Sequence, residues 1–194
     1  LRPAGTRRTA EPVNATATTQ DSMIKAMSTV LPLRAALMVV GPLTSSKEIH
    51  ATDDPEERVQ LQRANEKAIT ELADRLRQER RQPVINPGVL VIDGWSLDDY
   101  RRFFLDVLGR FVQCAYFIRG WEYSQGVTAE FLLCRERGVE CRDDKGDVIA
   151  DEIAVALLQA AIRHLCDTGK HFEWMAERAE AFNALSIPLA PKSP

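Results

Sequence analysis

The sequence predicts an α/β protein in which a parallel sheet of about four to five strands carries helices on both faces. Two observations lead to this prediction. Short apolar runs that stop at glycine or proline alternate along the chain with longer segments in which apolar residues recur every three or four positions. The runs have the length of buried strands, and the segments have the period of amphipathic helices. Strands that alternate with helices in this way become parallel, because each helix crosses back over the sheet.

Four apolar runs are expected as strands, at 33–40, 83–86, 113–120 and 139–141. The first run stops at Gly41 and the second stops at Pro87, and both residue types interrupt a buried strand. The third run reads QCAYFIRG and the fourth is the short VEC. In an open parallel sheet, ligands bind beyond the carboxyl ends of the strands. The loops to consider are therefore 41–54, 86–95 and 119–126.

Five segments are expected as helices, at 55–80, 96–111, 126–137, 148–166 and 170–185. The first has Asp53 or Asp54 as its cap and Pro55 at its first position. The second starts with a serine cap and carries aromatic and aliphatic residues on one side. The last two follow the fourth strand as additional C-terminal helices. Their apolar faces, which include Phe172 and Trp174, could form an added interface or a lid.

One α/β domain is expected over 23–168, followed by a C-terminal helix and tail over 169–194. Residues 1–22 are rich in Thr, Ala, Arg and Pro and are interpreted as a flexible tail, with an organelle-targeting leader as the alternative. The last nine residues, SIPLAPKSP, are expected to be extended.

Charge and composition exclude some classes of binding partner. The net charge is −3 and the pI is about 5.7, which disfavours a polymeric nucleic acid. No uncharged apolar run reaches the roughly 18 to 20 residues of a membrane helix, so no membrane partner is expected. The four cysteines and three histidines lack metal-ligand spacing, and we expect reduced thiols, no metal, no cofactor and a cytoplasmic location.

The corner RGWEYSQGVTAEF, at 119–131, combines a glycine, a hydroxyl, aromatic rings and a carboxylate. Gly126 lets backbone approach a ligand closely, Ser124 adds a hydroxyl, and the next helix directs its first amides into the crevice. The first-strand loop, GPLTSS, adds similar groups at Gly41, Ser45 and Ser46. Two such loops suit a phosphate, although glycine and serine are also common in ordinary turns. The Gly41 loop is not a P-loop, because the order G-x-x-x-x-G-K-[ST] is absent.

Two acidic residues are candidates for chemistry. Glu130 lies one turn into the expected helix, and Asp106 borders the apolar side of the preceding helix. Either residue could be an ordinary helix-surface acid. Two carboxylates beside a phosphate cradle would suit glycosyl transfer, in which one attacks the anomeric carbon and the other handles a proton.

Aromatic and basic residues near the same edge could contact a nucleotide. Trp121 and Tyr123 could stack on a base, or they could form a packed lid or a subunit contact. Arg101 or Arg119 could supply charge to a phosphate, and either could equally be a solvated arginine.

The segments VVGPLTS, VINPG, DDYRRFFLDVL, CAYFIRGW and SQGVTAE, in this order, resemble the nucleoside 2-deoxyribosyltransferase-like superfamily over residues 35–142. That superfamily includes deoxynucleoside 5′-monophosphate N-glycosidases. The resemblance implies a flavodoxin-like sheet and a homodimer or higher homo-oligomer. It also implies that Glu130 is a nucleophile forming a covalent sugar intermediate, and that Asp106 positions or protonates the base. The substrate-binding residues that we expect are Gly41, Pro42, Ser45, Ser46, Trp121, Tyr123, Ser124 and Gly126.

Three departures from the family pattern bear on the substrate. Transferases acting on free nucleosides have Asp where this chain has Ser124, and a hydroxyl accommodates a 5′-phosphate that a carboxylate would repel. Val127 replaces a threonine, and the aromatic residue usual after the first-strand loop is missing. We therefore expect an N-glycosidase or deoxyribosyltransferase acting on a nucleoside or its 5′-monophosphate. The alternatives are a non-catalytic nucleotide-binding or sensing module and an oligomeric scaffold.

Overall fold

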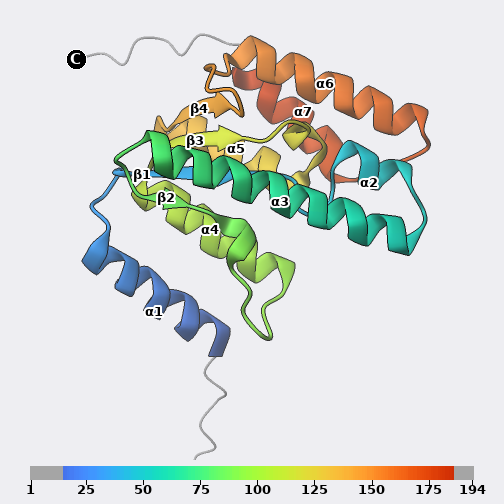
Figure 1. Cartoon of the computed structure of the whole chain (residues 1–194). Coiled ribbons are helices and arrows are strands. Elements are labelled where there is room, and N and C mark those ends of the chain that lie inside the picture. Colours follow the sequence, from blue (N-terminus) through green and yellow to red (C-terminus); the bar gives the residue numbers. More distant parts are fainter. Residues whose placement is uncertain (1–14, 186–194) are drawn as a thin grey trace, which may run out of the picture.

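The computed structural model describes residues 15–185, and its centre is a four-stranded parallel sheet with the order β2–β1–β3–β4 (Figure 1). The strands are Ala36–Val40 (β1), Val84–Ile85 (β2), Val112–Phe117 (β3) and Glu140–Asp143 (β4). Every neighbouring pair in this sheet is parallel. The predicted flavodoxin-like α/β fold is thus confirmed, and the strand order reverses between β1 and β3.

The helices are Ala15–Val30 (α1), Lys47–Ala51 (α2), Pro55–Glu79 (α3), Leu97–Phe111 (α4), Gln125–Arg137 (α5), Asp151–Asp167 (α6) and Trp174–Leu185 (α7). Two short 3₁₀ turns, Pro87–Val89 (η1) and Trp121–Tyr123 (η2), follow β2 and β3. α6 and α7 lie side by side on the β4 side of the molecule, where they pack on α5 and η2 (Figure 1). They are the additional C-terminal helices that the sequence predicts.

Local capping explains where the two long central helices begin. Asp54, the residue directly before Pro55, is the N-cap of α3. Its carboxylate accepts a hydrogen bond from the Glu56 backbone amide at 2.9 Å. At α4, Ser96 and Asp99 form a capping box in which each side chain accepts from the other's backbone amide. Both caps satisfy amides that have no partner inside the helix, so the predicted starts of these helices are confirmed.

Helices cover both faces of the sheet, as expected, but unequally. On one face, α3 alone packs on the sheet, with Ile69 and Leu72 against Leu37 and Val39. The opposite face carries the larger core, which α4 and α5 form with α6, α7 and α1. β1 is buried along its whole length, because its side chains alternate between these two cores.

The N-terminal boundary differs from the prediction. Residues 15–22, expected in a tail, belong to α1, whereas residues 1–14 and 186–194 lie outside the described residues. α1 packs on α4 through Ile24, and Gln20 Nε2 donates to the Asp99 carbonyl at 2.9 Å. Apolar residues at helical spacing, starting at Met23, supply the contact that holds this helix against the domain.

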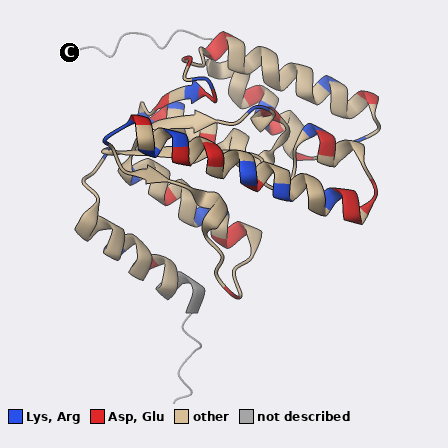
Figure 2. Ribbon diagram, viewed as in Figure 1, with Lys and Arg blue, Asp and Glu red and all other residues tan. Residues whose placement is uncertain are grey.

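The outer surface mixes charges of both signs. Along α3, lysine and arginine residues alternate with aspartate and glutamate residues (Figure 2). This helix therefore presents a mixed face and not the basic stripe of a protein that binds nucleic acid through its phosphates. Among the helices of residues 15–185, none is long and apolar enough to span a membrane.

Candidate active site

A cavity of about 490 Å³ opens at the carboxyl ends of β1 and β3, where the strand order reverses. Its walls come from the loop after β1, from η1 and the residues that follow it, from α4, and from the first turns of α5. Ligands of open parallel sheets bind at this kind of position, because the loops on either side of the reversal separate and leave a crevice. The cavity is the candidate site.

The loop after β1 contributes Gly41 and Ser45 to the cavity wall. A Cβ atom on Gly41 would lie 2.9 Å from Ile69 Cγ1, so glycine is required where β1 passes α3. Pro42 and Ser46 do not line the cavity. They hold the loop instead: the Pro42 carbonyl accepts from Asn65 Nδ2 at 2.7 Å, and Ser46 caps α2.

The N-terminus of α5 faces the cavity. Ser124 is the N-cap, and its Oγ accepts from the Val127 amide at 3.4 Å. Gly126, in the first turn, lines the cavity, and the nearest atom to a Cβ placed there is Ser124 Oγ at 4.0 Å. The backbone is thus open to a ligand, and the partial positive charge of a helix N-terminus favours an anionic group. The expected contributions of Ser124 and Gly126 to one crevice agree with this geometry.

Glu130 lines the same cavity one turn further along α5. Burial of its carboxyl group raises the pKa of Glu130 to about 8, and the positive charge of Arg101 opposes part of that rise. Among residues 15–185, the Glu130 carboxylate makes no hydrogen bond or ion pair. A carboxyl group in a cavity without a protein partner is available to a ligand, and perturbed acids of this kind are concentrated at functional sites.

α4 forms one wall, through Tyr100, Arg101 and Phe104. Arg101 donates to the Asp98 carboxylate at 2.7 Å and keeps 35% of its side chain exposed, so its charge is shared between that pair and the cavity. The Tyr100 hydroxyl accepts from the Ile92 amide at 2.6 Å, which fixes the ring against the loop before α4.

Asp106 is not brought into this cavity. Its carboxylate accepts from Arg110 Nε at 2.5 Å, and 40% of its side chain is exposed. Asp106 is five positions after Arg101, which corresponds to about 140° around a helix. The side of α4 that faces the cavity therefore cannot carry Asp106 as well, and the paired-carboxylate arrangement expected from the sequence is not formed by these two residues.

The two aromatic residues of η2 lie in different environments. Trp121 is buried in the core, stacked on Phe131 with ring centroids 4.8 Å apart, and it does not line the cavity. Tyr123 does line it, and its carbonyl oxygen lies 3.1 Å from His50 Nε2. Trp121 thus takes the packing role that was the alternative to base stacking.

Several lining residues were not identified from the sequence as parts of this site, and they include His50, Glu66, Phe172 and Trp174. Glu66 is an exposed carboxylate on α3 at the rim. Phe172 comes from the connection into α7 and Trp174 is the first residue of α7. Phe172 lies against His50 with ring centroids 5.2 Å apart. No spacing in the sequence relates Phe172 and Trp174 to β1 or β3, because the packing of α7 on α5 brings them to the cavity.

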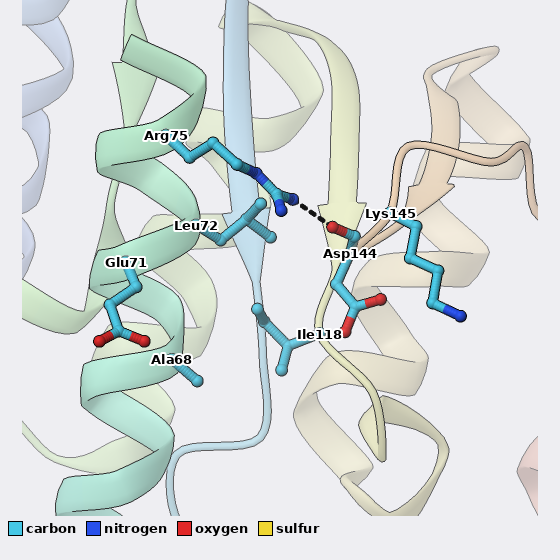
Figure 3. A pocket seen from close by; sticks show the side chains of 7 residues that line it. All are labelled: Ala68, Glu71, Leu72, Arg75, Ile118, Asp144 and Lys145. Atoms are coloured by element: carbon cyan, nitrogen blue, oxygen red, sulfur yellow. Dashed lines mark hydrogen bonds between the residues drawn. The ribbon is translucent and has the colours of Figure 1, made fainter. Parts of the chain in front are cut away.

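A second hollow, of about 430 Å³, lies between α3 and the turn after β4 (Figure 3). The Arg75 guanidinium crosses it to donate to the Asp144 carbonyl, and the Glu71 carboxylate points away from both (Figure 3). Neither the N-terminus of α5 nor Glu130 lines this hollow, so it lacks the anion-binding amides and the carboxyl group of the first cavity.

Within residues 15–185, no cluster of His, Cys, Asp and Glu is suited to hold a metal ion. The chain matches no family model, no curated protein and no solved structure. The resemblance to the nucleoside 2-deoxyribosyltransferase-like superfamily therefore rests on the sequence motifs.

Proposed function

We propose that the protein cleaves the N-glycosidic bond of a nucleoside or its 5′-monophosphate, with Glu130 as the nucleophile. The observation that carries the proposal is the position of Glu130: an unpaired, partly buried carboxyl group in the cavity that also contains the open N-terminus of α5. The family resemblance assigns the same residue the same role. Nucleophile and anion-binding groups in one crevice are what a glycosyl transfer from a nucleotide needs.

In the proposed reaction, ionised Glu130 attacks C1′ while the C1′–N bond breaks. The base leaves with the bonding electron pair and takes a proton, and a covalent sugar ester remains on Glu130. Water then adds to C1′, gives up a proton and releases the carboxylate; a second base in place of water would give transfer. The Arg101 charge favours the ionised state that the first step requires.

The anionic end of the substrate is proposed to lie at the α5 N-terminus. Gly126 leaves the first-turn amides open, and Ser124 can add its hydroxyl. Amide donors and the helix dipole favour a phosphate, and no carboxylate occupies this turn to repel it. These features support a 5′-monophosphate over a free nucleoside.

A second candidate is a nucleotide-binding or sensing module without turnover. Two observations favour it: Asp106 lies outside the cavity, and Glu130 with a pKa of about 8 is mostly protonated at neutral pH. A neutral carboxylic acid donates a hydrogen bond to a ligand but does not attack carbon.

Release of free base separates the two candidates. Purified protein is incubated with each common deoxynucleoside 5′-monophosphate between pH 6 and 9, and free base is measured by chromatography. The glycosidase proposal expects release that Glu130→Gln abolishes and that Glu136→Gln, on an exposed part of α5, leaves unchanged. Ligand-induced thermal stabilisation without any release would instead support the binding module.

We also propose a homodimer or higher homo-oligomer. Two aliphatic side chains that line the cavity, Val91 (83%) and Leu97 (70%), are exposed, as is Val89 (67%) in the adjacent η1. Exposed apolar groups that gather beside a site often mark an interface. Light scattering of Val91→Glu against wild type tests this proposal, because a charge in the interface should lower the molar mass.

A further inference from the structure

We propose that Phe172, in the connection between α6 and α7, is the surface on which the nucleobase stacks. This inference rests on the proposed nucleotide substrate and adds the subsite for its base. Trp121, which from the sequence could either stack on a base or pack against the protein, is buried in the core at 3% exposure. Phe172 lines the cavity and is only half-buried. It is therefore an aromatic ring that a ligand can reach.

Phe172 contacts two other rings. Its centroid lies 5.2 Å from that of His50, at an interplanar angle of 50°, and 6.2 Å from that of Trp174, at 21°. Trp174 is buried at 9% exposure, so it backs Phe172 from the protein side. His50 is fixed in turn by its contact with the Tyr123 carbonyl. The ring thus keeps one packed side, and the remaining apolar surface gains from being covered by a flat ligand.

The backbone of the connection is also fixed. The Phe172 amide donates to Met175 Sδ at 3.3 Å, and the Met175 amide donates to the Phe172 carbonyl at 3.1 Å. Lys170 pairs with Asp53 at 3.3 Å, which links the connection to the loop before α3. A ring that is already fixed loses little conformational entropy when a base stacks on it.

The cavity separates polar from aromatic surface in a way that suits a nucleotide. Glu130 and Arg101 belong to α5 and α4, and the open amides belong to the first turn of α5. Phe172 belongs to a different wall, which α2 and the α6–α7 connection build through His50. Tyr100 is less suitable for stacking, because its hydroxyl is bound to Ile92 and its ring packs edge-on against Trp95, 5.0 Å away.

The test compares ligands with and without a base. Binding of 2′-deoxyadenosine 5′-monophosphate and of 2-deoxyribose 5-phosphate is measured by calorimetry on full-length protein that carries Glu130→Gln, which prevents turnover. Adding Phe172→Ala should weaken the nucleotide about tenfold or more and change the sugar phosphate less than about twofold, in line with the usual contribution of base stacking. Phe172→Tyr keeps the ring and should restore most of the nucleotide affinity.

The control is His171→Ala, an exposed neighbour that does not line the cavity and should change neither affinity. Unchanged nucleotide binding in both Phe172→Ala and Phe172→Leu, with both proteins folded by circular dichroism, would overturn the stacking inference and leave the proposed function standing. Equal weakening of both ligands would also overturn it, since Phe172 would then only shape the pocket. If none of the common deoxynucleoside 5′-monophosphates binds protein with native Phe172, the proposed function fails as well.

Discussion

The raised pKa of Glu130 makes a quantitative prediction about stability. Its carboxyl group has a pKa of about 8 in the folded protein, against 4.5 for an unperturbed glutamate, because burial disfavours the ionised form. An acid whose pKa rises on folding contributes fully to stability below the unfolded pKa. That contribution is lost as the pH rises through the interval from 4.5 to about 8.

The magnitude follows from the same interval. Each pH unit within it costs about 1.4 kcal/mol of unfolding free energy, which gives about 4 to 5 kcal/mol in total as an upper bound. Solvent reaches part of the Glu130 side chain through the cavity, which reduces the cost. Glu130→Gln resembles the neutral acid and never ionises, so the variant should escape this loss.

The assay is urea unfolding of wild type and Glu130→Gln at pH values from 5 to 9. The variant should match wild type near pH 5 and become progressively more stable up to about pH 8, where the difference levels off. Glu136→Gln, on an exposed position of the same helix, should follow wild type throughout. Parallel curves for wild type and Glu130→Gln would refute the reasoning, because Glu130 would then titrate alike in the folded and unfolded chain.

Four further predictions concern the site and the loop after β1. If Glu130 is the nucleophile, kcat/KM should rise tenfold per pH unit up to about pH 8; a fall above that pH would identify it as a proton donor instead. Arg101→Gln should raise the pKa of Glu130 further and move that profile to higher pH, which a pH series on the variant measures. Gly126→Ala should keep the protein folded, with at most about 1 kcal/mol change in unfolding free energy. It should weaken a phosphate ligand in calorimetry, because the added methyl enters the cavity. Gly41→Ala should instead destabilise the protein by about 1–3 kcal/mol in urea unfolding, because its Cβ meets Ile69.

Local signals predicted most of the secondary structure. The apolar period and the caps at Asp54 and Ser96 placed α3 and α4, since a helix start depends on a few adjacent residues. Two helices were missed. α1 begins in a segment rich in Ala and Thr, and its stability comes from packing on α4. α2 has five residues, too few to show a helical period.

The sequence by itself determined the sheet, the loops at its carboxyl edge and the placement of Gly41, Ser124 and Glu130 beside one another, because parallel strands deliver the residues that follow them to a common edge. Only the tertiary structure decided which side of each helix faces the cavity. It turned Asp106 toward Arg110 and buried Trp121 against Phe131. It also placed Phe172 in contact with His50, from which it is distant in the sequence. Such choices depend on how helices distant in the chain pack, and no local spacing records that.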